Sequence, residues 1–286
     1  MTTPRVHTSE LRGTALANEI RARAASAATE LTAAGTPPQL AVVVATDDGS
    51  SAWYVRSIAR AAAKTGIQCT LVELGPKATA EQIRTSLTAL SADPEVHGII
   101  LQTPLPDGVA FDDLAAAIDP AKDVDGANPL SLGRLTANLP AFAPATAAAV
   151  LALLDRHEIE LAGRHAVVVG RSTVVGKPTA QLLLQRDATV SICHRHTKDL
   201  AEITRRADVL ISAAGRIGLI TAAHVAPEAV IIDVGTNPTD DGGLVGDVDT
   251  ASVQGRVAGV TPVPGGVGPV TTALLLQHTV QAARRR

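Results

Sequence analysis

The chain alternates between short apolar runs and longer stretches in which apolar residues recur at helical spacing. In the first half, the short runs are rich in Val, Ile and Leu and are bounded by turn residues, which is typical of buried parallel strands. They occupy residues 37–46, 67–74 and 96–106. Stretches with helical spacing lie between and before them, at residues 7–35, 50–67 and 79–93. This order predicts β-α-β units and an α/β fold.

The first helical stretch carries signals at both of its ends. Thr8 or Ser9 is a plausible N-cap, and Gly35 is suited to end the helix. We therefore expect one long helix that begins close to the N-terminus.

The second half contains five more strand-like runs with helical segments between the earlier ones. They occupy residues 165–170, 189–194, 208–215, 229–235 and 258–266. Five strands in α/β alternation within about one hundred residues match a nucleotide-binding Rossmann domain. We expect a first domain at 1–146, a Rossmann domain at 147–268, and a closing helix at 269–286 that packs back on the first domain.

Composition and charge narrow the range of partners. A net charge of −3 leaves no basic surface for nucleic acid, and no basic amphipathic helix suggests a membrane surface. The N-terminal segment has no apolar stretch of the signal-peptide kind, so we expect a cytoplasmic protein with small-molecule partners or other subunits. Cys69 and Cys193 both lie in apolar strand-like runs, where buried reduced thiols are favoured over a disulfide or a metal pair.

A glycine turn follows the first strand of the predicted Rossmann domain. The strand ends at Gly170, the turn carries Arg171 and Ser172, and a helix begins near Gly176 with Pro178 in its first turn. Such a turn presents backbone N–H groups and a helix N-terminus to a phosphate. It is not a G-x-G-x-x-G sequence, and a single glycine turn of this kind is often only structural.

The end of the next strand favours the cofactor interpretation. A dinucleotide domain that prefers NAD commonly places Asp or Glu here for the ribose hydroxyl, whereas this chain has Arg195 and His196, with Arg171 in the neighbouring turn. Two guanidinium groups favour a 2′-phosphate, which predicts NADP over NAD. The alternative is that Arg195 is an ordinary surface residue.

Two further loops contain candidate binding residues. Asp123 and Asp125 form a carboxylate pair that could bind a metal or cap a turn, and spacing alone favours capping. We predict no metal site. Residues 261–266 are rich in Gly and Pro, follow an apolar strand and open a helix, so a ligand could approach the backbone closely there.

Together these motifs resemble the methylenetetrahydrofolate dehydrogenase/methenyltetrahydrofolate cyclohydrolase family, FolD. The resemblance covers nearly all of the chain and rests on an ordered series of motifs: YV with GI twelve residues later, HGIILQTPLP, IDPAKDVDG, GRSTVVGKP, CHRHTK, IIDVGTN, LVGDVD and TPVPGGVGPVT. It implies two α/β domains, an N-terminal folate-binding domain and a Rossmann-type NADP-binding domain, with a cleft between them that holds a tetrahydrofolate derivative. It also implies a homodimer.

The resemblance assigns catalytic roles to three residues and removes a fourth. Tyr54 matches the tyrosine that stacks on the aminobenzoate ring, Asp125 matches the carboxylate that binds the pterin edge, and Gln102 matches a glutamine beside the catalytic lysine. That lysine is absent, because Ile58 occupies its position. Since the family lysine is the acid and base of the hydrolysis step, its loss should impair hydrolysis more than oxidation.

The remaining assignments follow the same motifs. For the substrate the resemblance implies Pro264, Gly265 and Gly266. For NADP it implies Gly170, Arg171, Ser172, Val175, Gly176, His194, Arg195, Thr197 and Thr236. Other departures, among them Thr103 after Gln102 and Phe142 in the loop before the interdomain helix, also fall on the folate side.

The leading hypothesis is an NADP-dependent methylenetetrahydrofolate dehydrogenase in which the cyclohydrolase step is lost or weak. One alternative is a recruited FolD paralogue that acts on a modified one-carbon carrier in a specialised pathway. Another is a protein that binds folate or NADP without turnover. A shikimate-type dehydrogenase would not explain the KDVDG and PVPGGVGPVT motifs together.

Overall fold

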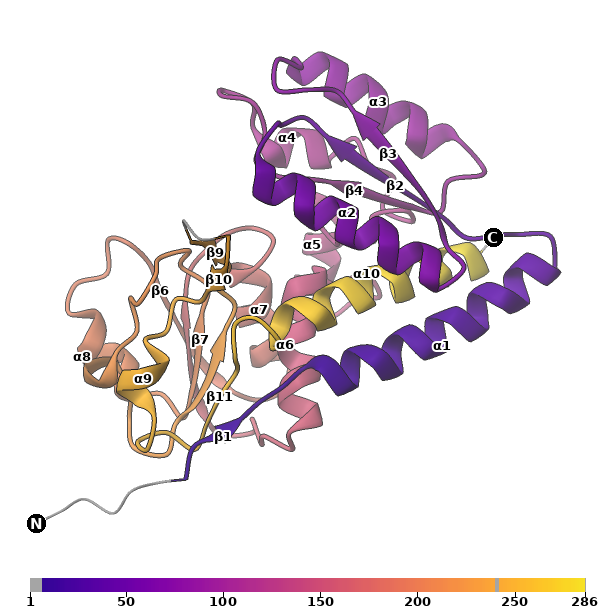
Figure 1. Cartoon of the computed structure of the whole chain (residues 1–286). Helices are drawn as coiled ribbons and strands as arrows, with labels where there is room; N and C mark the ends of the chain where they lie inside the picture. Colours follow the sequence, from indigo (N-terminus) through magenta and orange to yellow (C-terminus); the bar gives the residue numbers. More distant parts are fainter. Residues whose placement is uncertain (1–6, 240–241, 286) are drawn as a thin grey trace, which may run out of the picture. The chain divides into compact units, whose positions relative to one another are not determined.

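The structure is a computed structural model that describes residues 7–239 and 242–285. Close internal packing divides these residues into two compact units, which are described separately (Figure 1). The three-stranded unit comprises residues 17–145 and 272–285, and the six-stranded unit comprises residues 7–16 and 146–271. The chain therefore passes from one unit to the other within α1, at the start of α6 and within α10.

The three-stranded unit is a parallel sheet with helices on both faces. The central strand β2 (Gln39–Val44) pairs with β3 (Gln68–Glu73) on one side and with β4 (Gly98–Leu101) on the other. Alternate residues of β2 enter two different cores, as the two-residue period of a strand requires. The helices that supply these cores are α1 (Thr14–Ala33), α2 (Gly49–Lys64) and α10 (Val267–Arg284) on one face, and α3 (Ala80–Ala92) and α4 (Phe111–Ala115) on the other.

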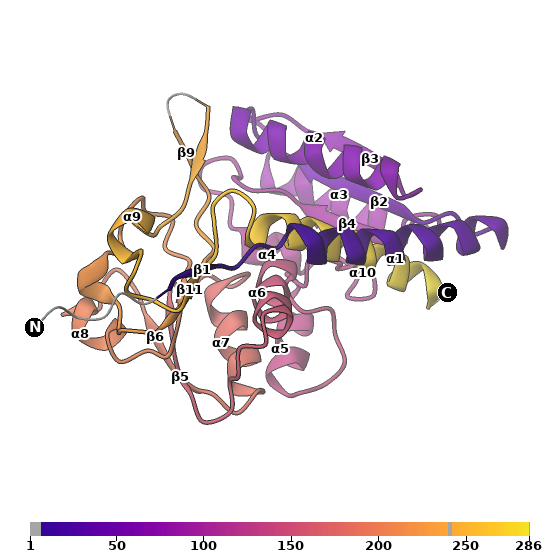
Figure 2. The ribbon, with the colours of Figure 1, turned by 60° about the horizontal axis from the view of Figure 1, so that its bottom comes forward.

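The six-stranded unit has a parallel sheet in the order β1-β11-β8-β7-β5-β6. Its strands are β1 (Ser9–Glu10), β5 (His165–Val169), β6 (Thr189–Cys193), β7 (Val209–Ser212), β8 (Val230–Asp233) and β11 (Gly259–Val260). Helices α8 (Leu200–Thr204) and α9 (Thr250–Val253) lie on one side of this sheet, and α6 (Ala145–Arg156) and α7 (Gly176–Leu184) lie on the other (Figures 1 and 2). Strand order reverses around β5, as in a doubly wound nucleotide-binding fold.

The first residues of the chain differ from the sequence expectation. Ser9 and Glu10 form β1, whose neighbours bond to β11: the amide of Ser9 donates to Ala258 O at 2.8 Å, and that of Leu11 to Val260 O at 2.9 Å. The predicted N-cap at Thr8 or Ser9 is therefore wrong, and the helix begins at Thr14. Residues 7–16 also group with the six-stranded unit, whereas the sequence placed all of residues 1–146 in the first domain.

The other predicted strands and helices are present, with local signals at several ends. Gly35 lies just beyond α1 with a φ of 86°, and Thr79 forms a capping box with Gln82 at the start of α3. The structure adds short elements that the pattern did not indicate: α4, α5 (Pro129–Thr136), the 3₁₀ turn Ala222–His224, α9, and the hairpin of β9 (Asn237–Pro238) and β10 (Leu244–Val245). Within the described part of the chain, every helix is too short or too polar to cross a lipid bilayer.

Candidate functional site

The turn after β5 is built around two glycines. Gly170 has a φ of 137°, and a Cβ there would lie 2.2 Å from the carbonyl oxygen of Ala213. A Cβ on Gly176 would lie 2.2 Å from the carbonyl oxygen of Gly170. Real Cβ atoms do not approach an oxygen this closely, so both positions require glycine. The turn therefore brings the end of β5 close to the start of α7 and to the end of β7.

Polar groups of this turn are placed for an anion. The hydroxyl of Ser172 accepts the amide of Gly176 at 3.3 Å, which closes the turn over the start of α7. Val175 occupies the N-cap position of α7, but its side chain makes no capping hydrogen bond to the first turn of the helix. The side chains of Arg171 and Ser172 are exposed. A helix N-terminus with a neighbouring guanidinium favours a phosphate group.

The end of β6 lies against the same turn. The amide of Gly170 donates to Cys193 O at 2.9 Å, which holds the two strand ends together. Beyond β6, the amide of His194 donates to Thr197 Oγ1 at 2.8 Å, and Arg195 Nε contacts His196 Nε2 at 3.1 Å. Arg195 and His196 are exposed. This edge of the sheet thus carries hydrogen-bond donors and no acidic residue where a ribose-binding carboxylate would be expected.

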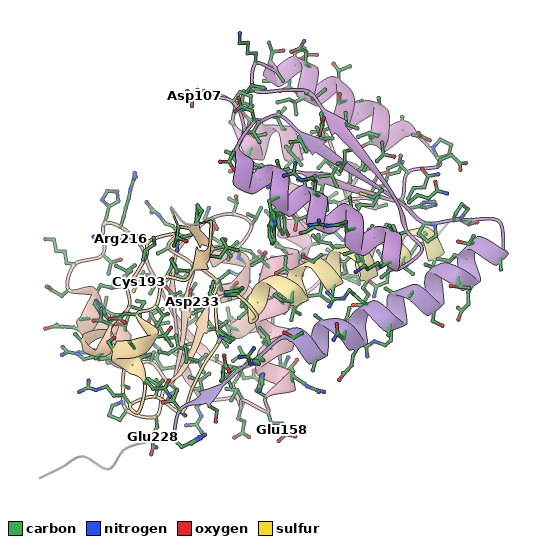
Figure 3. All side chains as sticks on the ribbon, in the orientation of Figure 1. Asp107, Glu158, Cys193, Arg216, Glu228 and Asp233 are labelled. Carbon is green, nitrogen blue, oxygen red and sulfur yellow. The ribbon has the colours of Figure 1, made fainter. Side chains whose placement is uncertain are left out.

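The carboxyl ends of β7 and β8 border the same edge of the six-stranded sheet. Cys193, Arg216 and Asp233 mark this end in Figure 3, whereas Glu158 and Glu228 lie at the opposite end. The exposed residue Thr236 lies in the loop after β8. Since parallel α/β sheets bind nucleotides beyond the carboxyl ends of their strands, the predicted cofactor residues share the expected edge.

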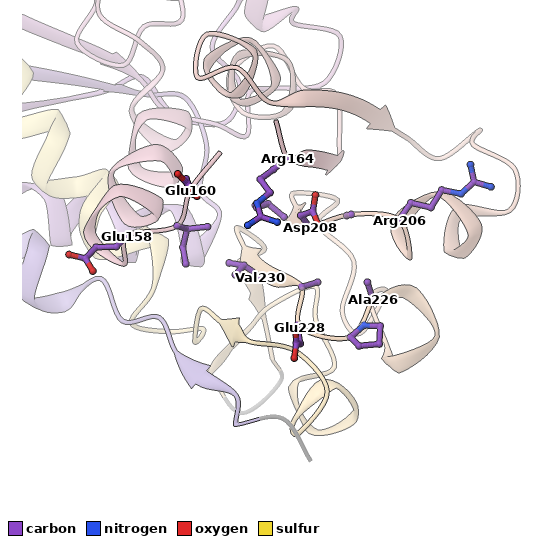
Figure 4. A pocket seen from close by; sticks show the side chains of 13 residues that line it. Glu158, Glu160, Arg164, Arg206, Asp208, Ala226, Glu228 and Val230 are labelled. Carbon is purple, nitrogen blue, oxygen red and sulfur yellow. The ribbon is translucent and has the colours of Figure 1, made fainter. Parts of the chain in front are cut away.

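An open groove of about 510 Å³ lies at the other end of this sheet. Its lining includes the charged residues Arg164, Asp208 and Glu228, near the amino ends of β5, β7 and β8 (Figure 4). The amide of His165 donates to the Asp208 carboxylate at 2.8 Å, so this acid caps the start of β5. The groove is on the wrong edge for a dinucleotide, and one of its charged groups, Asp208, has a structural use.

In the three-stranded unit, Tyr54 and Asp125 interact. Burial is the main cause of a raised pKa of the Tyr54 phenol; the Asp125 charge adds to the shift, and a hydrogen bond with Thr272 opposes it. Burial, and next the charge of Asp123, raise the pKa of Asp125 to about 7, with a hydrogen bond from the Ala145 backbone acting in the opposite direction. The site therefore combines an aromatic face with a carboxyl group that is poised between its two protonation states at neutral pH.

Asp123, the other carboxylate of the pair, has a structural role. It is fully buried, and its oxygens accept the amides of Ala127 at 2.9 Å and Asn128 at 2.8 Å. Burial raises the pKa of Asp123, while these hydrogen bonds and one from Ser131 act against the shift. Asp123 thus fixes the turn that presents Asp125.

Ile58 is completely buried in the core on the α2 face of the sheet. It lies one helical turn after Tyr54, in a cluster that includes Val124 and Phe142. Tyr54 packs against the same cluster. The position is therefore next to the candidate site, and it offers a hydrocarbon instead of a titratable group.

Gln102 and the glycine-rich loop are placed by their own local contacts. Gln102 directly follows β4, and its side-chain amide donates to Thr103 O at 2.6 Å. The loop with Pro264, Gly265 and Gly266 belongs to the six-stranded unit, where the amide of Gly13 donates to Gly265 O at 2.9 Å. The structure thus brings Tyr54 and Asp125 together, and it places the three loop residues in the other unit.

Neither cysteine is in a disulfide: Cys193 is buried and Cys69 is partly buried. Among the described residues, no group of three or more His, Cys, Asp or Glu side chains is arranged to hold a metal ion.

Comparison with known proteins assigns both units. Residues 11–125 match the catalytic domain of tetrahydrofolate dehydrogenase/cyclohydrolase, and residues 144–286 match its NAD(P)-binding domain. The chain belongs to this family. It is 73% identical over 278 residues to the bifunctional protein FolD 1 of Saccharopolyspora erythraea, which covers 97% of this chain and 95% of that protein.

Solved structures of the tetrahydrofolate dehydrogenase/cyclohydrolase family show the same fold. The FolD enzyme of Campylobacter jejuni is 40% identical, with a TM-score of 0.93 and coverage of 98% of this chain and 99% of that one. The Trypanosoma brucei enzyme, solved with NADP and an inhibitor, is 35% identical, with a TM-score of 0.92 and coverage of 99% of both chains. The predicted family and the predicted two-domain α/β fold are confirmed.

Two groups of residues were missed by sequence reasoning. Thr272 bonds to Tyr54 from α10, a helix whose sequence reads as an ordinary apolar helix. Asp233 and Asp247 are almost completely buried beside the predicted cofactor loops. Their motifs, IIDVGTN and LVGDVD, were visible in the sequence, but no spacing rule indicated what the carboxylates contact.

Proposed function

We propose that this chain is an NADP-dependent methylenetetrahydrofolate dehydrogenase whose cyclohydrolase step is lost or weak. It converts 5,10-methylenetetrahydrofolate to 5,10-methenyltetrahydrofolate. The observation that carries the second part is Ile58, a fully buried hydrocarbon at the position where the FolD motif has its lysine. The close relatives are called bifunctional, so this is a proposed departure of the present chain.

The six-stranded unit fits NADP. The turn from Gly170 to Gly176 has no room for a Cβ at either end, which keeps its backbone open to a phosphate. Arg171 and Arg195 are exposed at the same edge and would bind the 2′-phosphate through charge-assisted hydrogen bonds. Thr197 holds the segment after β6, and Thr236 borders the edge from β8. When bound, NADP supplies the acceptor for the hydride.

The three-stranded unit fits a reduced folate. Tyr54 offers a half-buried ring on which the aminobenzoate can stack, and Asp125 offers two oxygens to the amino-imine edge of the pterin. With its pKa raised to about 7, Asp125 can hold or release a proton at neutral pH, and two donors on the pterin would favour its charged form. Gln102, at the end of β4, matches the family glutamine that lies beside the catalytic lysine and would take part in the same site.

The two family reactions make different demands on this site. Oxidation of the bridging methylene needs the reacting carbons in register, and the folate nitrogens stabilise the resulting cation. Hydrolysis of the methenyl product needs a group that removes a proton from water and then delivers one to a ring nitrogen. Ile58 has no atom that can do either. Oxidation should therefore persist where hydrolysis fails.

A pair of assays tests the proposal. The first follows NADPH formation from methylenetetrahydrofolate, and the second follows decay of added methenyltetrahydrofolate with and without the protein. We expect NADPH formation together with product decay at the spontaneous rate of the buffer. Rapid decay would show that another group replaces the lysine. Absence of NADPH, with folate still bound, would favour the recruited-paralogue or binding-protein alternative.

We also propose that the chain forms a homodimer. Within the described part of the sheet, β3 is hydrogen-bonded to another strand on one side only. An edge strand of this kind can pair with a second copy. Light scattering at micromolar concentration would give twice the chain mass if the proposal holds, and the chain mass if it does not.

A further inference from the structure

Asp247 is a completely buried carboxylate that accepts hydrogen bonds from the loop after β7. Its Oδ2 accepts the amides of Ala214 at 2.7 Å and Gly215 at 3.2 Å, and its Oδ1 accepts the amide of Arg216 at 2.8 Å. The hydroxyl of Ser212, the last residue of β7, adds a fourth bond at 3.2 Å. Three consecutive backbone N–H groups thus converge on one side chain.

The same carboxylate also reaches the loop after β8. Asn237 donates its side-chain amide to Asp247 Oδ1 at 3.1 Å. Asp233, the last residue of β8, accepts the amides of Gly235 at 2.9 Å and Asp247 at 3.0 Å on one oxygen, and that of Val248 at 2.9 Å on the other. Two acids therefore join both loops to the segment that carries Asp247.

The surrounding glycines show how closely these groups pack. A Cβ on Gly235 would lie 2.4 Å from Asp247 Oδ1, and one on Gly246 would lie 1.9 Å from Asp233 Oδ2. The glycines of the IIDVGTN and LVGDVD motifs therefore leave room for the two carboxylates. Any side chain at either position would displace an acid from the amides that it holds.

We propose that Asp247 is a positioning residue for NADP, through the loop at residues 214–216 and the loop at residues 235–237. Both loops follow strands at the carboxyl edge of the six-stranded sheet, and the second contains Thr236. The inference rests on the proposed function, because it takes NADP as the cofactor. Asp247 does not contact the cofactor; it fixes the backbone that does.

The chemistry of the contact explains why a carboxylate is needed. The five groups that hydrogen-bond to the Asp247 side chain are all donors, three on Oδ2 and two on Oδ1. An ionised carboxylate suits them because it only accepts and has about four lone-pair sites, which the five donors share. An asparagine of the same shape keeps one oxygen but turns an NH₂ toward other donors. The loops would then lose some of their bonds and face a donor–donor contact, at nearly unchanged side-chain volume.

The test compares Asp247→Asn with Asp123→Asn, which removes an equally buried acid from the other unit. NADP affinity is measured by titration calorimetry, and hydrogen exchange of the amides at 214–216 is measured without cofactor. We expect Asp247→Asn to weaken NADP at least tenfold, to speed exchange of the three amides and to leave folate affinity within twofold. Asp123→Asn should lower thermal stability while NADP affinity stays within twofold of the unmutated protein.

Three outcomes would count against the proposed role of Asp247 or against NADP binding itself. If the three amides exchange faster in Asp247→Asn but NADP affinity stays within twofold, the inference is wrong. If Asp247→Asn does not fold, the double variant Ser212→Ala/Asn237→Ala removes the two side-chain donors that connect Asp247 to β7 and to the loop after β8. It should weaken NADP at least threefold, and unchanged affinity overturns the inference. If the unmutated protein itself does not bind NADP, the proposed function fails first.

Discussion

Replacing Ile58 with lysine would place an amine one turn after Tyr54, in a core that now excludes water. The amine would be largely neutral, because burial disfavours the charged form. A neutral amine beside a bound folate is the kind of group that hydrolysis needs. We therefore expect Ile58→Lys to gain methenyltetrahydrofolate hydrolysis.

The cost to stability can be bounded. A lysine in water has a pKa of about 10.4, so keeping it neutral at pH 7 costs about 5 kcal/mol, at roughly 1.4 kcal/mol per pH unit. Domains are commonly stable by about 5–15 kcal/mol, so the variant should remain folded, but weakened, if the unmutated protein is stable by more than about 5 kcal/mol. A lysine whose folded pKa lies below its unfolded value is penalised less as pH rises toward 10.4. The difference in unfolding free energy between Ile58→Lys and Ile58→Met should shrink from pH 7 to pH 9.5.

The assay follows the near-ultraviolet absorbance of methenyltetrahydrofolate after correction for spontaneous hydrolysis. Ile58→Met is the matched control, because it is linear and apolar and lacks the amine. We expect Ile58→Lys to exceed the control by about tenfold, below the roughly hundredfold to ten-thousandfold of a tuned acid or base. Equal rates in the two variants, with both proteins folded and folate bound, would refute the role assigned to this position.

Three further predictions concern the binding residues. Asp125→Asn should abolish folate binding and leave NADP binding intact. The folded pKa of Asp125, about 7, lies above its unfolded value, so the charged carboxylate destabilises the folded protein at high pH. The variant should therefore have a higher melting temperature than the unmutated protein at pH 8, and not at pH 4. Arg195→Ser should reduce the preference for NADP over NAD about tenfold, since a hydrogen bond to a charged group contributes roughly 1.5–3 kcal/mol; Arg164→Ser, in the groove at the opposite edge, is the control. Gly170→Ala should weaken NADP more than tenfold, because its Cβ would meet Ala213 O at 2.2 Å, whereas Gly133→Ala meets nothing within 4 Å.

Each of these has a distinct contrary result. Unchanged folate affinity in Asp125→Asn would mean that the pterin is held elsewhere, and a lower melting temperature at pH 8 would contradict the raised pKa. Equal NADP and NAD affinities in the unmutated protein would remove the basis for Arg195. Normal NADP binding in a folded Gly170→Ala variant would show that the turn relaxes without cost to the site.

The sequence predicted those parts of the fold that local patterns encode. Strands such as β2 and β5 are short runs that end in three consecutive valines, and α3 begins at a capping box that can be read directly from Thr79 and Gln82. The error at residues 8–10 arose because nothing local distinguishes an N-cap from a two-residue strand. Only the partner, β11, decides between them.

For the candidate site, the sequence predicted several residues but not their burial or their long-range contacts. Motifs identified Gly170, Tyr54 and Asp125, since each resembles a known pattern. They could not show that Ile58 is fully buried, that Thr272 reaches Tyr54 from another helix, or that Asp247 collects amides from residues more than thirty positions away. Burial and long-range hydrogen bonds are properties of the folded chain, and one sequence without structure contains no direct signal for them.

The pairing of β1 with β11 has a consequence for the order in which the protein can be assembled. Ser9 lies opposite Gly259, so during synthesis β1 has no partner until a segment about 250 residues later in the chain has been made. Until then, the edge of β8 that pairs with β11 has no neighbouring strand. The loop with Pro264 and Gly265, which follows β11, is also not yet held in place. A nascent or truncated chain that stops before residue 259 should therefore hold four strands of the large sheet, lack the glycine-rich loop, and expose an open edge to chaperones or to other chains.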